Sequence, residues 1–408
     1  MNEPTSYGEK DTYSDDVAIT GTGCVTAYGD GVDTLFDGWN SGHDALTDGW
    51  GQCTSFDPGR YLSRAEMRRT DRFAQMALVA TQEAADQARW GQAGPYEPNR
   101  VACVIATTSS GQQTVESELA VLADKGPRGV AAVRVMLAGP DATAVLISMR
   151  FNVQGECYGM SGACAGGAMA VGAGVRMIRS GSADAVIVGG ADAGMSGLVQ
   201  AMYSNLGAIS PDGQCRPFDR RRNGFVPGEG AGILILENAR HAADRGADIL
   251  GYVSGYGSSS DAHHLTMPNK AGQVRTITDC LGDSDIDAAE IDYINAHGTG
   301  TRLNDEIETA AIAESLGKVA LDIPISSVKS SIGHLQGAAG AVEAIATLAV
   351  LRRGVIPATV GLTDPDPDLA LHCLPMSSIP LRPGHTSAVG LTNSFGLGGH
   401  NASLLIRS

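Results

Sequence analysis

The sequence has no cysteine pair in a Cys-X-X-Cys arrangement, although it contains eight cysteines. Clustered cysteines are typical of structural zinc sites and of disulfide-stapled secreted domains, so both classes are disfavoured and no metal site is predicted. The thiols are expected to be reduced, as in a cytoplasmic protein. No apolar run approaches the roughly 20 residues that span a bilayer, so no membrane contact is expected.

Basic residues are also few. Lys and Arg number 29 against 45 Asp and Glu, which gives a net charge of −16 and makes a nucleic-acid partner improbable. The 408 residues, 43% hydrophobic and 18% charged, are enough for one large α/β body with an ample core. The 53 glycines are spread through apolar segments and indicate tight turns and close packing rather than disorder.

Residues 1–16 are polar and acidic, and we expect a disordered tail there rather than a signal peptide or an anchor. The rest is expected to form two tightly packed halves, 17–245 and 246–408, because no Pro- or Ser-rich linker separates them. No sequence repeat relates the two halves.

Apolar strand patterns alternate with helical patterns in both halves, which predicts α/β layers with parallel sheets. In the first half the pattern predicts strands over 17–23, 100–107, 185–190 and 233–237, and helices over 64–90 and 161–180. In the second half it predicts strands over 249–255, 291–295 and 323–328, a closing strand over 387–393, and helices over 305–316 and 340–353.

Cys164 lies where a strand-like segment turns into an Ala/Gly-rich helix, in SGACAGG at 161–167. A thiol at a helix N-terminus is favoured as the thiolate, and free amides there can bind an oxyanion. The alternative is that Cys164 is a small buried apolar residue like the other cysteines.

Two histidines lie far downstream in Gly-rich turns. His297 follows a predicted strand in NAHGTGT at 295–301, where Thr299 and Thr301 offer hydroxyl groups. His334 lies in KSSIGHLQGAAG at 329–340, after Lys329 and before a helix that carries Glu343. A lysine and a glutamate beside a histidine can fix its tautomer and keep it neutral. Packed turns with satisfied histidines are the alternative.

One thiol and two imidazoles suit chemistry in which negative charge develops twice, such as decarboxylation followed by carbon–carbon bond formation on a thioester. With these motifs, NSFGLGGHN at 393–401, RPFD at 216–219 and NGFVPGEG at 223–230, the chain resembles the elongating β-ketoacyl-acyl carrier protein synthases. The resemblance covers nearly all of the chain from Val17 to Ile406. Because initiating condensing enzymes have Asn in place of the second histidine, His334 favours an elongating enzyme.

The resemblance implies an α/β fold of the thiolase type, with five α-β-α-β-α layers and two similar halves. It implies acyl transfer onto Cys164, and decarboxylation of malonyl carrier protein beside His297 and His334. Further roles are implied for the backbone N–H groups of Cys164 and Leu397 as an oxyanion hole, Thr299 and Thr301 on the phosphopantetheine arm, Phe225, Phe395 and Leu397 in substrate pockets, and Lys329 and Glu343 in support of the histidines. No permanently bound cofactor is expected.

The expected partners are acyl carrier protein and a second subunit of the same fold. Carrier proteins are typically acidic, so local basic residues are needed for docking. Arg68, Arg69 and Arg72 are expected on one helical stretch, and Arg216 matches a family docking position. Leu397 replaces the phenylalanine usual in the family, which suggests altered acyl acceptance.

Three alternatives stay open within this resemblance. IDYINAH at 291–297 is closer to the ketosynthase subunit of type II polyketide systems, which pairs with a chain-length partner, whereas KSSIGHLQGAAG is closer to a homodimeric fatty acid enzyme. A non-catalytic chain-length subunit would lack the nucleophile that Cys164 supplies. A biosynthetic thiolase would have a late cysteine, which the segment 393–401 lacks.

Overall fold

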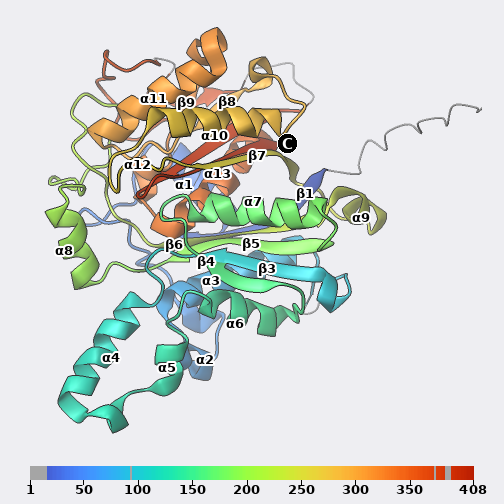
Figure 1. Ribbon diagram of the computed structural model, residues 1–408, viewed down its shortest axis with the longest axis vertical. Helices are drawn as coiled ribbons and strands as arrows, with labels where there is room; N and C mark the ends of the chain where they lie inside the picture. The colour runs from blue at the N-terminus through green and yellow to red at the C-terminus, as the bar shows by residue number, and fades with distance from the viewer. Residues whose placement is uncertain (1–15, 92–93, 372–373, 382–386) are drawn as a thin grey trace, which may run out of the picture.

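The structure is a computed structural model that describes residues 16–408 except 92–93, 372–373 and 382–386. The predicted disordered tail therefore lies outside the described residues, apart from Asp16. Within the described part, one mixed sheet of eleven strands runs through the molecule, with helices on its faces (Figure 1).

The strands form two groups with the same pattern. The first has the order β4-β3-β5-β6-β1, in which β3 is parallel to β4 and β5, and β6 is antiparallel to β5 and β1. The second has the order β9-β8-β12-β13-β7 with the corresponding directions. The strands of the first group are β1 (Val17–Thr26), β3 (Val101–Ala106), β4 (Cys157–Met160), β5 (Ala185–Asp192) and β6 (Gly230–Asn238), and those of the second are β7 (Gly251–Ser260), β8 (Tyr293–Asn295), β9 (Ile325–Ser326), β12 (Val389–Gly396) and β13 (His400–Arg407).

Hydrogen bonding between β1 and β7 joins the groups edge to edge. Helices α7 (Gly166–Arg179) and α13 (Ala339–Arg353) pack on each other between the groups, on β5 and β12 respectively. Helices α3 (Arg72–Gln87) and α6 (Ala142–Phe151) cover the outer face of the first group, and α10 (Lys270–Gly282) and α11 (Arg302–Leu316) that of the second. The five-layered α-β-α-β-α arrangement predicted from the sequence is confirmed.

The two central helices approach closely because glycines lie at their crossing. A side chain on Gly167 would place its Cβ 2.6 Å from the Ala341 nitrogen, and one on Gly340 would place it 2.6 Å from the Ala168 nitrogen. Nearly every residue of α13 is buried, which explains its continuous apolar sequence. This crossing fixes the start of α7 relative to the segment that precedes α13.

Three sequence predictions about secondary structure were wrong. The expected helix over 64–90 is broken: α2 (Arg64–Arg69) ends at Thr70, and Asp71 caps the separate helix α3 by accepting a hydrogen bond from Phe73 N–H. The expected closing strand is followed by β13, so the chain ends in a hairpin. The sheets are also not purely parallel, because β6 and β13 each run antiparallel to both neighbours.

The remaining elements surround this core, and α4 and α5 extend from its lower end in Figure 1. No described helix is both long and apolar enough to span a membrane. The elements outside the two strand groups and their covering helices are α1 (Val32–Asn40), α4 (Gln112–Lys125), α5 (Ala132–Met136), α8 (Gly197–Asn205), α9 (Ala239–Asp244) and α12 (Lys329–Ile332), with the short strands β2 (Gly29–Asp30), β10 (Val355–Ile356) and β11 (Ile379–Pro380).

Candidate active site

Cys164 lies in a tight turn between β4 and α7. Ala163 has a φ of 48°, a left-handed conformation that is unfavourable for a residue with a side chain. The end of β12 lies directly behind the turn, since a Cβ on Gly396 would come within 3.0 Å of the Cys164 nitrogen. The turn is therefore held in a strained geometry by contacts with the second strand group.

The Cys164 thiol is 8% exposed, and burial raises its pKa to about 11. The positive charge of Lys329 and a hydrogen bond from the Leu397 N–H lower that pKa only in part. The sequence-based expectation of a thiolate favoured by the helix N-terminus was therefore wrong for this structure. Desolvation outweighs the helix terminus because α7 begins at Gly166, two residues beyond the thiol.

His297 follows β8 and is 2% exposed. The Lys329 ammonium lies 3.2 Å from its Nδ1 and forms an ion pair with Glu343. Because an ammonium group only donates, Nδ1 must accept, and the neutral ring carries its hydrogen on Nε2. The Glu308 carboxylate accepts the backbone N–H groups of His297 and Gly298 at 2.7 and 2.8 Å and holds this turn.

His334 has the same tautomer for a different reason. The backbone N–H of Gln336 donates to His334 Nδ1 at 3.1 Å, which again leaves the hydrogen on Nε2. The ring centroids of His297 and His334 are 5.4 Å apart. Burial, followed by the positive charge of Lys329, lowers the pKa of both imidazoles well below the ordinary 6.5. Both rings are therefore neutral donors at neutral pH.

Cys164 and both histidines open into one cavity of about 310 Å³. Its mouth is apolar and exposed: Leu206 is 52% exposed, Met267 48%, Leu303 41% and Leu397 39%. Its floor is buried and mostly aromatic or polar. Of the residues predicted from the sequence, this cavity brings together Cys164, Phe225, His297, Thr299, Thr301, His334, Phe395 and Leu397.

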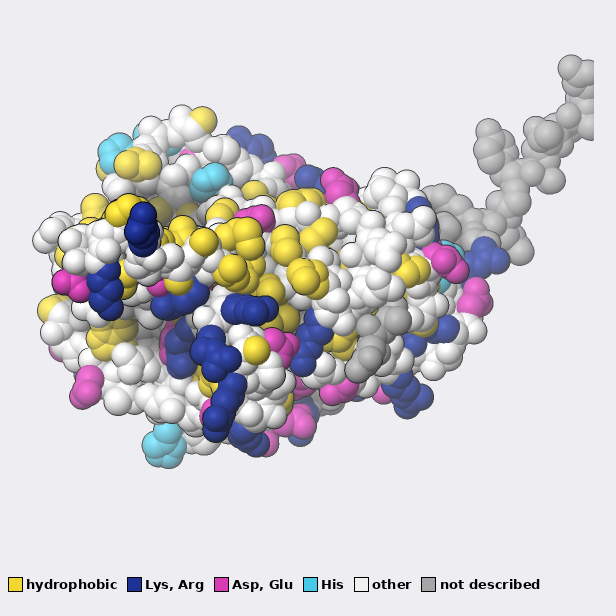
Figure 2. Space-filling model, turned by 90° about the horizontal axis from the view of Figure 1, so that it is seen from below, with side chains coloured by type: hydrophobic (Ala, Val, Ile, Leu, Met, Phe, Trp, Pro, Cys, Tyr) yellow, Lys and Arg dark blue, Asp and Glu magenta, His cyan; other side chains and the backbone are white. Residues whose placement is uncertain are grey.

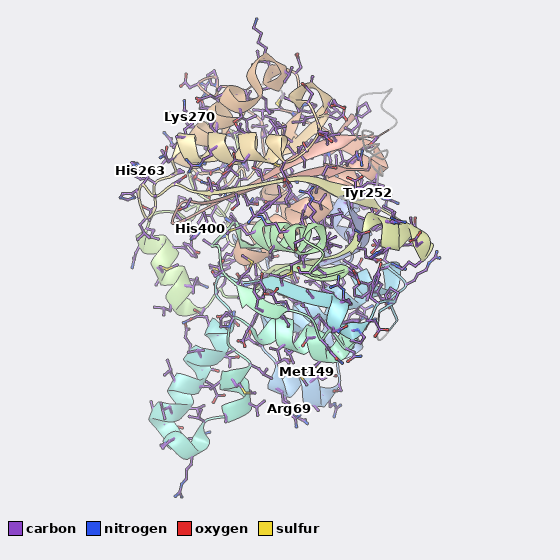
Figure 3. All side chains as sticks on the ribbon, turned by 45° about the vertical axis from the view of Figure 1, so that its right-hand side comes forward. Arg69, Met149, Tyr252, His263, Lys270 and His400 are labelled. Carbon is purple, nitrogen blue, oxygen red and sulfur yellow. The ribbon has the colours of Figure 1, made fainter. Side chains whose placement is uncertain are left out.

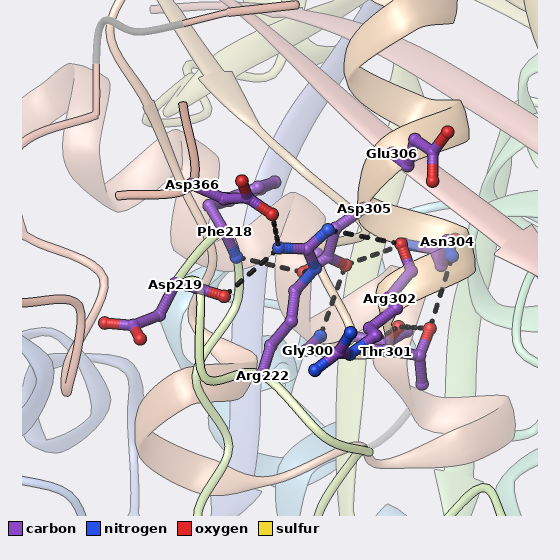
Figure 4. A network of polar contacts seen from close by, with 12 residues as sticks. Phe218, Asp219, Arg222, Gly300, Thr301, Arg302, Asn304, Asp305, Glu306 and Asp366 are labelled. Atoms are coloured by element: carbon purple, nitrogen blue, oxygen red, sulfur yellow. Dashed lines mark hydrogen bonds and ion pairs between the residues drawn. The ribbon is translucent and has the colours of Figure 1, made fainter. Parts of the chain in front are cut away.

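Lys329 and Glu343 lie behind His297 rather than on the wall, each 1% exposed. The hydroxyl groups of Thr299 and Thr301 lie 2.9 Å apart, and both residues line the cavity. A buried network under their turn holds it in place, with Asp305 accepting from the N–H groups of Phe218 and Gly300 at 2.9 and 3.3 Å (Figure 4).

The four predicted docking arginines do not line the cavity. Arg68 and Arg69 are exposed on α2, and Figure 3 shows Arg69 near Met149 at the lower edge of the main body. Arg72 belongs to α3 and forms a 2.7 Å ion pair with Glu229, so it does not share a helix with the other two. Arg216 has a side chain 14% exposed and pairs with Asp212.

The sequence analysis did not select several buried residues of the site. Asp192 at the end of β5 accepts the N–H groups of Thr108, Ser109 and Gly337 at 2.7, 3.2 and 3.1 Å. It thus holds together two loops from different halves. Glu308 could have been recognised as an acidic residue in the second turn of the helix that follows NAHGTGT, but the contact made by Asp192 depends on the three-dimensional fold.

Comparison with known proteins agrees with this geometry. Residues 14–242 match the model of the "Beta-ketoacyl synthase, N-terminal domain", and residues 250–363 that of the "Beta-ketoacyl synthase, C-terminal domain". The chain belongs to the β-ketoacyl synthase family. The family predicted from the sequence motifs is therefore confirmed.

Alignments with relatives of this synthase cover almost the whole chain. It is 35% identical to 3-oxoacyl-[acyl-carrier-protein] synthase 2 of Synechocystis sp., over 96% of this chain and 97% of that protein. It is 36% identical to the putative polyketide beta-ketoacyl synthase 1 of Streptomyces cyaneus, with the same coverage of both. Among solved structures, the ishigamide ketosynthase/chain length factor superimposes with a TM-score of 0.88 at 33% identity, covering 96% of this chain and 98% of that one.

Proposed function

We propose that this synthase catalyses decarboxylative condensation between an acyl group on Cys164 and a malonyl thioester on a carrier protein. The observation that carries the proposal is the single cavity in which a thiol meets two imidazoles, each fixed with its hydrogen on Nε2. A hydrolase of the Cys-His type needs a histidine that accepts a proton, whereas both rings here donate. The Synechocystis relative is named for acyl carrier protein, which supports the carrier as the thioester donor.

The first step transfers the acyl group. The Cys164 sulfur attacks the thioester carbonyl carbon, and the carrier thiol leaves with the proton that the Cys164 thiol gives up. The oxyanion of the tetrahedral intermediate accepts hydrogen bonds from the backbone N–H groups of Cys164 and Leu397. The Leu397 N–H already points at the sulfur, and each such donor is worth about 3 kcal/mol in comparable enzymes.

The second step uses the histidine pair. The malonyl carboxylate leaves as carbon dioxide, and its bonding electrons form an enolate whose oxygen accepts from the two Nε2–H groups. The α-carbon then attacks the acyl carbon on Cys164, and the sulfur leaves as thiolate. Neutral imidazoles suit this role, because they donate hydrogen bonds without transferring a proton to the enolate.

The remaining predicted residues fit around these atoms. Thr299 and Thr301 are proposed to hydrogen-bond the phosphopantetheine arm, because both hydroxyl-bearing side chains line the cavity. Phe225 packs edge-on to His334 at 5.4 Å between ring centroids and is proposed to cover the malonyl group. Phe395 packs against His297 with 6.1 Å between the ring centroids. Lys329, which is paired with Glu343, orients the His297 ring. No resident cofactor takes part in these steps.

Carrier docking is proposed on α2. Arg68 and Arg69 are exposed, whereas Arg72 and Arg216 are paired with Glu229 and Asp212. Arg68→Glu with Arg69→Glu should raise KM for the acyl carrier protein severalfold, because exposed charge pairs contribute little each. Acylation of Cys164 by a small thioester should be unchanged, as should both activities in the control Lys318→Glu. Equal losses with both donors would discard the docking proposal.

A partner of the same fold is proposed to cover α4, α5 and the edge strand β4. Exposed apolar side chains gather there, and Figure 2 shows hydrophobic side chains beside Lys and Arg on the face seen from below. Every residue of β4 is partly exposed at the sheet edge. We propose that this chain is the catalytic subunit and that its partner is a chain-length subunit, because Cys164 supplies the nucleophile. A homodimer is the alternative.

The purified chain tests these proposals directly. Incubated with acyl and malonyl carrier proteins, with and without a candidate chain-length subunit, it should release carbon dioxide and a 3-oxoacyl product. Cys164→Ala should abolish the product, whereas Cys157→Ala, a matched change on β4, should not. Condensation by the chain alone would favour the homodimer, and condensation that survives Cys164→Ala would refute the function.

A further inference from the structure

The floor of the active-site cavity contains polar groups that the condensation steps do not use. Gln336 is 1% exposed and Tyr203 5% exposed, and both line the cavity together with Cys164. A floor built to hold a saturated hydrocarbon chain would be apolar, since a buried polar group without a partner costs about 1–3 kcal/mol.

The Gln336 side-chain amide is oriented by its neighbours. Ser109 Oγ donates to Gln336 Oε1 at 2.8 Å, so the carbonyl side of the amide is occupied. Within the described residues, the one partner of the Nε2 group is the sulfur of Met195, at 3.0 Å. A thioether is a weak acceptor, so an N–H₂ donor remains poorly satisfied in the buried cavity wall.

The backbone at Gln336 supports a functional reason for this placement. Its φ is 51°, a left-handed conformation that costs a residue with a side chain about 1–2 kcal/mol. Asp192 holds both the residue that binds the Gln336 amide and the backbone next to Gln336. Its carboxylate accepts hydrogen bonds from the backbone N–H groups of Ser109 and Gly337 at 3.2 and 3.1 Å. A strained position that is over-determined by its surroundings is typical of ligand contacts.

The Tyr203 hydroxyl is a second unused group. Its ring packs edge-on to Phe225 at 5.3 Å between centroids, and the residue lines the cavity. Burial raises the pKa of Tyr203, so the hydroxyl keeps its proton and can donate, and Tyr203 lines the same cavity as Cys164. Two donors thus lie near the point where an acyl chain must begin.

We propose that Gln336 and Tyr203 determine acyl specificity by donating hydrogen bonds to oxo or hydroxyl oxygens on the chain held by Cys164. This inference rests on the proposed function and narrows its substrate class to oxygenated acyl chains. A saturated chain would press methylene groups against the Gln336 N–H₂ and leave it with the Met195 sulfur alone. An oxygenated chain would satisfy both donors.

The test measures acylation of Cys164 by intact-protein mass spectrometry with N-acetylcysteamine thioesters of hexanoic, 3-hydroxyhexanoic and 3-oxohexanoic acids. The wild-type protein should react faster with the oxygenated probes. Gln336→Leu and Tyr203→Phe should each shift the rate ratio about tenfold toward hexanoyl, the effect of one buried hydrogen bond. The matched control Gln113→Leu, whose amide donates to Ala193 O outside this cavity, should leave the ratio unchanged.

The variants and the probes together decide whether Gln336 and Tyr203 determine specificity. If Gln336→Leu does not fold, as judged by circular dichroism, Tyr203→Phe decides, because it removes one oxygen only. Equal rates for all three probes in the wild-type protein, or ratios that neither variant shifts, would overturn the specificity proposal and leave the condensation function standing. If no probe labels Cys164 in the wild-type protein, the proposed function fails and the specificity proposal falls with it.

Discussion

At the scale of single residues, the site is defined by where its protons lie. Lys329 fixes the tautomer of His297 through a side chain, and Gln336 fixes that of His334 through its backbone, with the same result at Nε2. The thiol keeps its proton, since burial raises the pKa of Cys164 to about 11. The resting site is therefore a neutral thiol facing two neutral donors.

This protonation state predicts a pH profile for thiol alkylation. Because the thiolate is the nucleophile and its pKa is raised, the rate of Cys164 alkylation by iodoacetamide should rise about tenfold per pH unit between pH 7 and pH 9. Peptide mapping by mass spectrometry follows the rate at Cys164 alone. A plateau already reached near pH 7 would contradict the raised pKa.

The donor role of His334 predicts a graded response to substitution. His334→Ala should lower carbon dioxide release from malonyl carrier protein about a hundredfold, the range measured for the loss of one charge-stabilising donor. His334→Asn should lower it less, because an amide N–H₂ remains. His264→Ala, an exposed histidine outside the cavity, serves as the control. Equal losses for Asn and Ala would argue against hydrogen-bond donation.

Leu397 has two separable functions in this account. Its N–H points at the Cys164 sulfur, while its side chain is 39% exposed at the cavity mouth. Leu397→Phe keeps the N–H and enlarges the side chain, so it should narrow the range of acyl chain lengths that label Cys164. Competition between thioesters of different length measures that range. An unchanged range would contradict the proposed gate.

The three candidate reactive residues could be selected from the sequence because each lies in a short Gly-rich turn. Cys164, His297 and His334 needed no knowledge of the fold to be selected. Asp192, Tyr203 and Gln336 could not be assigned in this way, since their significance depends on contacts with loops far away in the sequence.

At the scale of elements, the crossing of α7 and α13 positions the nucleophile. Gly340→Ala should force the two helices apart, because its Cβ would meet the Ala168 nitrogen at 2.6 Å. We expect a loss of about 1–3 kcal/mol in unfolding free energy, together with slower acylation of Cys164. Urea denaturation measures the stability of the variant.

The matched control is Gly282→Ala at the exposed end of α10, where an added Cβ meets nothing within 4 Å. It should be neutral or slightly stabilising, as expected for alanine in place of glycine in a helix. If Gly340→Ala were as well tolerated as Gly282→Ala, the crossing would not position the site.

Most elements were visible in the sequence as apolar runs, but their ends and pairing partners were not. The break at Thr70 arises from the Asp71 cap, a local signal hidden inside a long helical pattern. The hairpin between β12 and β13 turns at Gly398 and Gly399, with φ of 82° and 77°, within the motif at 393–401. The antiparallel direction of β6 depends on hydrogen bonds with β1, more than two hundred residues away.

At the scale of the whole molecule, two groups of strands with one pattern share a central helix layer, and the cavity forms between them. Cys164 comes from the first group and both histidines from the second, so neither group contains the site alone. The similarity of the groups was not visible as a sequence repeat, because it lies in strand order and direction.

The exposed apolar face predicts assembly. Leu119 is 58% exposed on α4 and Met136 is 67% exposed on α5, the two helices of the proposed partner surface. Leu119→Asp with Met136→Asp should weaken the proposed dimer, because charges buried at an interface must be desolvated. Multi-angle light scattering measures the mass. The control is Met376→Asp, because Met376 is 62% exposed on another part of the molecule. If the double substitution left the dimer intact, the interface would have to lie on a different surface.

The proposed function depends most directly on a covalent acyl group at one sulfur, and a pulse-chase experiment measures it. The wild-type protein is loaded from acyl carrier protein, its mass is recorded, and malonyl carrier protein is then added. We predict that the peptide containing Cys164 gains the mass of one acyl group. That acyl group should be lost during the chase, while carbon dioxide and 3-oxoacyl carrier protein appear. An acyl group on any other residue, or one that the malonyl chase leaves in place, would contradict the proposed function.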